Sequence, residues 1–430
     1  MYYTTATLII FVSILVMIRF KVPLWLSILA GAIFSGLLFK LGPLQTAVEI
    51  FNGSIQLKTV GLMIITLQIL SLSRIMKSTG LMNEIVDLAR QFLRRPAIVM
   101  AALPALIGLL PMPGGALFSA PMVKSAAGKD KATPEEMSAI NYWYRHIWEH
   151  WWPLYPGVML SITLTGLSFA DFAMFQLPLG VIMASTGLLL FRKTHPDLHK
   201  TAAAAPAGTK RKLLIAISPI WVLILAWMPA DFLLRNLVTS SSQAVEMFFH
   251  RFAPLICAMM VSIAVTSVIR KVRPAELLAV LKTKSSWLME ITIVSVMVLQ
   301  YLFTVTGASG KIAEELLTFR VPIVLVAAIL PLIAGLVTGL AIGFVGTSFP
   351  IVLALVAGAD THVPLHAYIA LAYGFGHLGQ MLSPIHVCHI VSNQYFKTGF
   401  ARVYKRTWPT FLANFILVIA YFLLLYNLGF

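Results

Sequence analysis

The sequence predicts an all-α polytopic membrane protein built from two inverted-topology repeats, and three observations lead to this fold class. Of the 430 residues, 59% are hydrophobic and only 11% are charged, and apolar runs long enough to cross a bilayer recur from end to end. A frame of the form H-x-x-[E/Q]-x-x-x-P starts at His146 and again at His377, so its positions match at a constant offset. One stretch rich in Pro and Gly interrupts the apolar pattern in each half, as in secondary transporters.

The basic residues sort to one side of the predicted membrane. Lys and Arg number 32 against 16 Asp and Glu, which gives a net charge of +16. If the loop at 192–212 is cytoplasmic, 25 of the 32 basic residues lie on that side, in segments 19–21, 74–95, 124–131, 192–212, 270–284 and 397–406. The positive-inside rule thus accounts for the charge, and nucleic acid is not expected as a partner. We expect a multi-pass protein of the inner (plasma) membrane with both termini outside.

About ten transmembrane helices fit this alternation. They are expected near residues 4–18, 23–39, 59–77, 136–160, 170–191, 213–230, 252–269, 287–306, 365–395 and 408–427. The first has no basic residue before it and no small-residue cleavage site after it, so it is interpreted as a retained span and not as a signal peptide. The first repeat unit then covers 1–200 and the second covers 213–430, joined by a cytoplasmic linker at 201–212.

The two Pro- and Gly-rich stretches, 96–122 and 322–357, are predicted to form re-entrant hairpins. They align on Pro104 and Pro331, and each has an apolar arm, a Gly-rich middle and a return that ends in Pro. Irregular backbone at membrane depth is tolerated only inside protein or beside water, so two such tips indicate a cavity. The alternative is that Pro and Gly only kink packed helices. Amphipathic helices expected at the membrane interface precede the hairpins, at 83–96 and 311–322.

The first broken helix, at 136–160, carries the charged candidates. Asn141, Arg145 and Glu149 are four residues apart, so we expect them on one helical face, with Asn141 and Arg145 assigned to substrate binding. Ionisable residues inside a span are functional candidates. Arg145 would attract an anionic substrate, Glu149 would bind and release the coupling proton, and His146 would bind the substrate or relay protons. The alternative is a buried structural ion pair between the arginine and the glutamate.

The second broken helix, at 365–395, matches the first without its charges. Gln380 stands where the first unit has Glu149, so the site is asymmetric on a symmetric scaffold. His377, Gln380 and Ser383 are assigned to substrate binding, with the helix break expected just after Ser383. The alternative for the glycines around His377 is close packing between helices.

The hairpin tips are expected to complete the pocket through backbone N–H groups and short polar side chains. The residues assigned to this role are Gly114, Gly115, Ser119, Gly346, Thr347 and Ser348. The alternative is that the hydroxyls bond to carbonyls of their own helix. His386 and His389, with Cys388 between them, suggest metal ligands, but no carboxylate or further Cys lies nearby in sequence, so no metal site is predicted.

Two features resemble known families. The order of span, interfacial helix, hairpin and broken polar helix, repeated with inversion, resembles the ion transporter superfamily, which includes gluconate permeases, dicarboxylate transporters and the large membrane subunit of TRAP transporters. The segment NYWYRHIWEHWWPLYPG, residues 141–157, resembles the permease family known as domain of unknown function 401, and the resemblance covers essentially the whole chain. It implies elevator-type alternating access and a homodimer. The Ser-Asn-Thr tips of the dicarboxylate/sodium branch are missing, so the ligands of that branch are not transferred.

These observations predict a permease, not an enzyme. It would be a secondary active transporter that carries a small organic anion, such as a carboxylate or sugar acid, in symport with H⁺, or alternatively Na⁺, and without another cofactor. An alternative within transport is a cation/proton antiporter that uses Glu149 and the carbonyls around His377. The alternative of another class is an intramembrane enzyme that uses the histidine cluster. The sequence has no Walker A motif, so we expect no direct use of ATP.

Overall fold

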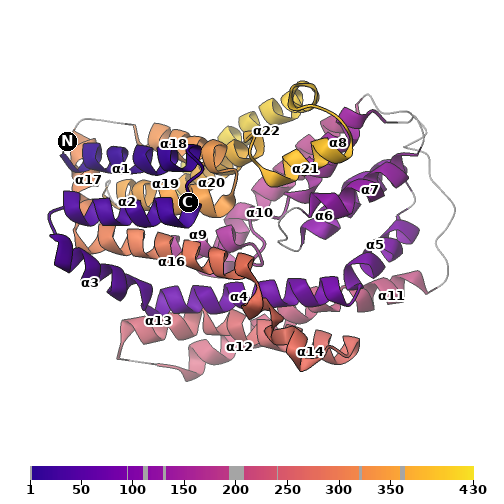
Figure 1. Cartoon of the computed structure of the whole chain (residues 1–430), viewed down its shortest axis with the longest axis horizontal. Helices are drawn as coiled ribbons and strands as arrows, with labels where there is room; N and C mark the ends of the chain where they lie inside the picture. Colours follow the sequence, from indigo (N-terminus) through magenta and orange to yellow (C-terminus); the bar gives the residue numbers. More distant parts are fainter. Residues whose placement is uncertain are drawn as a thin grey trace.

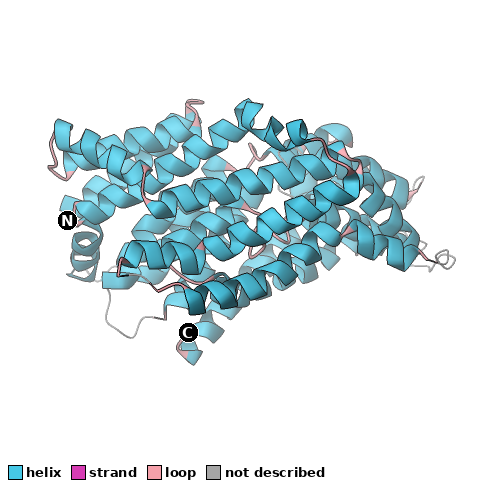
Figure 2. Cartoon of the chain, turned by 90° about the horizontal axis from the view of Figure 1, so that it is seen from below, coloured by secondary structure: helices cyan, strands magenta, loops and turns pink. Residues whose placement is uncertain are grey.

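The chain folds entirely into helices and connecting segments over the residues that the structure describes (Figure 2). This computed structural model describes residues 2–93, 95–109, 115–128, 132–192, 208–239, 241–318, 322–358 and 364–430. Within these ranges, eight helices are long and apolar enough to cross a membrane, and four shorter apolar helices accompany them. The all-α membrane class predicted from the sequence is confirmed.

The first unit contains ten α-helices and one 3₁₀ helix within the described residues. In chain order they are α1 (Tyr2–Arg19), α2 (Leu24–Leu38), α3 (Pro43–Ser54), α4 (Leu57–Ser78), α5 (Leu81–Phe92), α6 (Pro96–Gly108), α7 (Ala116–Ala127), α8 (Pro134–Arg145), α9 (Pro156–Thr165), α10 (Phe169–Thr186) and η1 (Gly187–Phe191).

The second unit contains the remaining helices of the described residues. They are α11 (Thr209–Ala216), α12 (Ser218–Leu237), α13 (Gln243–Arg251), α14 (Ala253–Arg270), α15 (Pro274–Leu277), η3 (Leu278–Lys282), α16 (Lys284–Val305), α17 (Ala308–Thr318), α18 (Ile323–Thr338), α19 (Ala341–Gly358), α20 (Leu365–Leu382), α21 (Val387–Tyr395) and α22 (Phe400–Leu428).

Helix starts repeat at two fixed offsets. Helices α4, α5 and α6 begin at 57, 81 and 96, and α16, α17 and α18 begin with the same spacing at 284, 308 and 323. Helices α8, α9 and α10 begin at 134, 156 and 169, and α20, α21 and α22 begin with the same spacing at 365, 387 and 400. These six helices therefore occur twice in the same order. The offset between α8, α9 and α10 and their counterparts α20, α21 and α22 is the same as the offset of the recurring frame. The inverted orientation of the two units stays a prediction.

A glycine with positive φ precedes the same short helix in each half. Gly80 has φ 71° and Gly307 has φ 65°, a conformation that glycine adopts without the steric cost that a Cβ brings. The tight turns start α5 and α17 before the positions 83 and 311 predicted from sequence. Each helix leads into the first arm of a Pro- and Gly-rich stretch.

Each Pro- and Gly-rich stretch forms two helices that pack against each other, α6 with α7 and α18 with α19. The second arm of each pair also contacts the other half, since α7 packs against α21 and α19 packs against α9. The tip of the first pair, 110–114, lies outside the described residues, and the second pair turns at 339–340. Whether these pairs are re-entrant in the membrane stays a prediction.

The longer helices run mainly along the long axis of the molecule (Figure 1). Helices α12, α13 and α14 form a layer below α4 in this view, while α6, α7, α8 and α21 gather at the right. Both termini lie toward the left-hand end, and α11 lies at the right-hand end. The termini and α11 are thus separated along the long axis, while the cytoplasmic identity of one side stays a prediction.

The first broken helix ends earlier than predicted. Helix α8 stops at Arg145, and residues 146–155 form turns before α9 begins. Asn141 and Arg145 lie on the same helix, but Glu149 lies beyond it, so the predicted helical stack of all three residues is wrong. The break in the second unit is where it was predicted, because α20 ends at Leu382 with Ser383 as its C-cap.

Candidate functional site

Aromatic side chains fix the broken segment of the first unit against the end of α6. The bonds run from the Trp148 indole to the Ala105 carbonyl (2.7 Å), from the Trp152 indole to the Leu109 carbonyl (3.0 Å) and from the Tyr155 hydroxyl to the Gly108 carbonyl. The last carbonyls of a helix have no partner within it, and at this end the Gly108 and Leu109 carbonyls accept from Tyr155 and Trp152. The Ala105 carbonyl accepts from both the Leu109 N–H at 3.1 Å and the Trp148 indole. The tryptophans therefore hold the chain in its non-helical path, a role that sequence reasoning missed.

A closely matched backbone contact occurs in both units. A Cβ added to Gly108 would lie 2.1 Å from the carbonyl oxygen of Arg145, and one added to Gly335 would lie 2.1 Å from the carbonyl oxygen of Gly376. The two glycines are related by the offset between α6 and α18, and their partners by the offset between α8 and α20. Glycine thus allows α6 to approach α8, and α18 to approach α20, at backbone distance.

Glu149 lies where the two units meet. Its Oε2 accepts a hydrogen bond from Gln380 Nε2 at 2.7 Å, and its carbonyl oxygen accepts one from the Tyr373 hydroxyl at 2.6 Å. His146 Nε2 lies 3.8 Å from Oε1, and His377 Nε2 lies 3.6 Å from Oε2. Glu149 is only 8% exposed. A carboxylate, an amide and two imidazoles from both units therefore share one buried polar centre.

Glu149 and Gln380 occupy the same position of the recurring frame, and their side chains bond to each other. The buried polar centre thus holds one carboxylate opposite one amide, which is the asymmetry expected from the sequence.

A cavity of about 180 Å³ opens beside this centre. Four of the predicted site residues line it: Arg145, His146, Glu149 and Gln380. The lining also includes Tyr155, His386 and Cys388, which sequence reasoning did not assign to the site. The offset of the recurring frame relates position 155 to 386 and position 157 to 388, but no residue at 155 or 157 was assigned to the site, so the frame gave no signal for them.

Two predicted residues, Asn141 and Gly115, do not line the cavity but pack next to residues that do. Asn141 is fully buried, and its amide donates to the Ala116 carbonyl at 3.0 Å and to Ser392 Oγ at 2.8 Å. A Cβ added to Gly115 would lie 2.3 Å from Nη2 of Arg145. The start of α7 therefore packs directly against the arginine that lines the cavity.

The predicted hydroxyl groups bond within their own helices. Ser119 donates to the carbonyl three residues earlier at 3.4 Å, while Thr347 and Ser348 donate to carbonyls four residues earlier at 2.7 and 2.6 Å. They do not occur among the residues that line the cavity. Their geometry matches the alternative in which hydroxyls in membrane helices satisfy the local backbone.

The remaining predicted residues lie around the centre without lining the cavity. Gly346 faces α16, because a Cβ there would lie 2.5 Å from a methyl carbon of Val296. His377 contacts Glu149 as described above, and Ser383 is buried at the end of α20. Gly114 lies outside the described residues.

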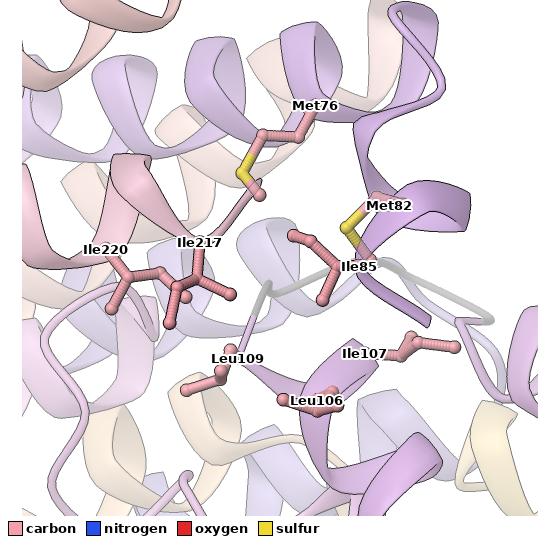
Figure 3. Close-up of a pocket in the computed structure, with 8 residues that line it drawn as sticks. All are labelled: Met76, Met82, Ile85, Leu106, Ile107, Leu109, Ile217 and Ile220. Atoms are coloured by element: carbon pink, nitrogen blue, oxygen red, sulfur yellow. The ribbon is translucent and has the colours of Figure 1, made fainter. Parts of the chain in front are cut away.

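A second hollow, between α4, α5, α6 and the start of α12, is apolar and small (Figure 3). It measures about 10 Å³, close to the space that one water molecule needs. Its lining consists of Met76, Met82, Ile85, Leu106, Ile107, Leu109, Ile217 and Ile220. This hollow offers neither room nor polar groups for an organic solute.

Comparisons with known proteins agree with this fold. The family model described as "Protein of unknown function (DUF401)" matches residues 4–425. The structure is similar to that of the Alcanivorax borkumensis YdaH transporter, with a TM-score of 0.63 and 12% identity over 90% of this chain and 88% of that one. It is also similar to Neisseria gonorrhoeae MtrF, which is described with a class of antimetabolite efflux pumps, with a TM-score of 0.57 and 11% identity over 89% of this chain and 84% of that one. Among curated proteins, none matches the chain.

Proposed function

The chain belongs to the DUF401 family, and from that premise we propose that it is a secondary active transporter of a small organic anion, such as a carboxylate or sugar acid, coupled to protons. The observation that carries this proposal is the buried Glu149–Gln380 pair between the two units, which faces a cavity shared with Arg145. This chain has a fold similar to that of YdaH, which is described as a transporter, and to that of MtrF, which is described with a class of efflux pumps. Both similarities support transport over catalysis. Alternating access of the elevator type would carry the site between the two faces.

The charge at the cavity favours an anion. Arg145 is 2% exposed, and a guanidinium keeps its charge under all physiological conditions. A cavity of about 180 Å³ holds on the order of a dozen water-sized positions, which suits a solute of about ten non-hydrogen atoms. The guanidinium fork matches a carboxylate in shape and hydrogen bonding. A small carboxylate or sugar acid therefore fits both the charge and the volume.

Glu149 is the group best placed to couple the solute to protons. Its ionised carboxylate repels an incoming anion and competes with it for Arg145, and both effects vanish when it takes up a proton. Protonation and anion binding therefore strengthen each other, and the coupling is reciprocal. That is the thermodynamic requirement for symport.

The test is uptake into proteoliposomes with a panel of mono- and dicarboxylates and sugar acids, at two pH values, with and without sodium. Charge movement and an internal pH dye are recorded together, so that an electroneutral cycle is also seen. Glu149→Gln should abolish a solute-specific signal that needs a proton gradient. Glu84→Gln is the matched control, because this surface carboxylate pairs with Arg270 at 2.6 Å, far in sequence from the centre.

Two outcomes would overturn the proposal. A pH change driven by sodium alone would indicate cation/proton antiport. A solute signal that persists unchanged in folded Glu149→Gln protein would place coupling elsewhere. Loss of the signal in both variants would show that the effect is not specific to the buried carboxylate.

A further inference from the structure

We propose that His146, His386 and Cys388 form a binding site for a divalent transition metal ion of the zinc class. The two histidines are 240 residues apart and come from different units, so the donor set exists only in the folded chain. All three residues line the cavity described above. The inference stands on these donors alone and does not rest on the proposed transport function.

The donor atoms already lie close together. One ring nitrogen from each histidine and the sulfur of Cys388 all lie within 4.8 Å of one another. The two Nε2 atoms of His146 and His386 are 3.0 Å apart. Zinc–nitrogen bonds of about 2.0 Å and a zinc–sulfur bond of about 2.3 Å require tetrahedral donors roughly 3.3 to 3.6 Å apart. The nitrogen–sulfur pairs therefore have to contract by at most about 1 Å, and the histidine pair has to open by a few tenths of an ångström.

A hydrogen bond from His146 determines which of its ring nitrogens is available to bind a metal. Its Nδ1 lies 2.6 Å from the carbonyl oxygen of Tyr142, which only accepts hydrogen bonds, so Nδ1 carries the proton. In the neutral ring this leaves a lone pair on Nε2, the atom that faces His386. Histidines that bind metals commonly donate their other N–H to a backbone carbonyl in this way.

Tyr142 also holds both imidazole rings in place. Its ring packs edge-on against His146 and His386, with centroid distances of 5.1 and 5.3 Å. Its hydroxyl is itself anchored, because it donates to the Met381 carbonyl at 2.9 Å. His389 stacks on the same tyrosine with a centroid distance of 4.4 Å and is not part of the donor group. The two ligand rings are thus oriented before an ion arrives.

The donor types select the class of metal. Thiolate and imidazole suit zinc and similar borderline or soft ions, whereas sodium, magnesium and calcium prefer oxygen ligands. Three protein ligands leave a fourth position on the cavity side. Glu149 Oε1, which is 3.8 Å from His146 Nε2, is near enough to fill it or to balance the charge. Cys388 as a thiolate and Glu149 as a carboxylate together offset the charge of a divalent ion.

Cobalt(II) is the probe for this site, because a thiolate ligand gives it an absorption band that a histidine or carboxylate does not. The purified full chain in detergent is stripped with a chelator and titrated with cobalt, and zinc is then added to displace it. The expected result is a saturable band at one cobalt per chain, removed by zinc. The band should vanish in Cys388→Ser, and His386→Asn should weaken binding by at least about tenfold.

Cys257→Ser is the matched control, since Cys257 is the other cysteine of the chain and is not a member of the donor group. Elution as a single species in size-exclusion chromatography confirms folding for each variant, and His386→Asn carries the test if Cys388→Ser does not fold. The absence of a saturable band in folded wild-type protein would overturn the proposal. A band that survives Cys388→Ser, or is lost in Cys257→Ser, would do the same. Because no transport is measured, failure here is distinct from failure of the proposed function.

Discussion

Replacing Gly335 by Ala is expected to push α18 away from α20. A Cβ at this position would lie 2.1 Å from the carbonyl oxygen of Gly376, 2.7 Å from the amide nitrogen of Gln380 and 3.1 Å from the carbonyl carbon of Gly379. All three are backbone atoms, so no side-chain rotation relieves the clash. One methyl group thus acts on the helix that presents Gln380 to the centre.

The magnitude follows from the shortest contact. Ordinary van der Waals contact begins at 3.4 Å, against 2.1 Å here, so the helices have to separate by about 1.3 Å. Overpacking of this kind costs about 1–3 kcal/mol, and we expect the upper end because backbone meets backbone. A shift of about 1.3 Å along the 2.7 Å bond between Gln380 and Glu149 would break that bond. Stability and solute uptake should fall together.

The assay is thermal stability in detergent, followed by the fraction that remains monodisperse after heating. Gly310→Ala is the control, because a Cβ there has nothing within 4 Å and the residue lies inside α17. It should leave stability unchanged or raise it by about 0.5–1 kcal/mol through helix propensity. If Gly335→Ala melts at or above the wild-type temperature, the helices are not in backbone contact and the described packing is wrong.

Three further predictions test other parts of the structure. Trp148→Phe removes one of the two hydrogen bonds to the Ala105 carbonyl, the other being from the Leu109 N–H at 3.1 Å, and should cost about 0.5–1.5 kcal/mol of unfolding free energy. Trp287→Phe, whose residue is 45% exposed, should change it by less than about 0.5 kcal/mol. Equal losses in thermal stability would contradict this. Glu290 is 1% exposed, and neither of its carboxylate oxygens has a hydrogen-bond partner among the described residues. Because a buried polar group without a partner destabilises the fold, Glu290→Met should raise the melting temperature. A lower melting temperature would show that the carboxylate has a stabilising partner. Partial burial raises the pKa of Glu315, but backbone N–H groups at the start of α1 outweigh it and hold the pKa below 4.5. This contact should therefore stabilise the chain above pH 4.5, and the stabilisation should be lost as the pH falls through the lower pKa that Glu315 has in the folded chain. The loss would be seen as faster hydrogen exchange in the first turn of α1. Exchange that does not change with pH, after correction for the intrinsic rate, would argue against the contact.

The class of the fold and its repeat could be predicted from the sequence because they depend on patterns that survive divergence. Apolar runs, paired Pro and Gly stretches and the recurring frame each mark a helix start or a break. The starts of α8, α9 and α10 recur in α20, α21 and α22 at the offset of that frame. Arg145, His146, Glu149 and Gln380 could be assigned to the site for the same reason, since polar groups inside spans have few uses.

The details of the site depend on contacts that no local pattern encodes. Glu149 leaves the helix because Trp148 and Trp152 bond to α6, about 43 residues earlier in the chain. His386 meets His146 across 240 residues, so their spacing along the chain says nothing about a shared ligand. Ser119 illustrates the opposite error, because a hydroxyl near a predicted tip satisfies its own helix instead of the pocket.

The aromatic side chains at the broken helices also affect how many backbone carbonyls near the centre are available as ligands for a dehydrated cation. An alkali cation that sheds its hydration shell needs several oxygen ligands, which membrane proteins usually supply as carbonyls. Indole or phenol groups already occupy one lone pair on each of five carbonyls near the centre, those of Ala105, Gly108, Leu109, Met381 and Leu382. A proton needs only a single carboxylate. We therefore expect these five carbonyls to be poor ligands for sodium, which supports the proposal of proton coupling.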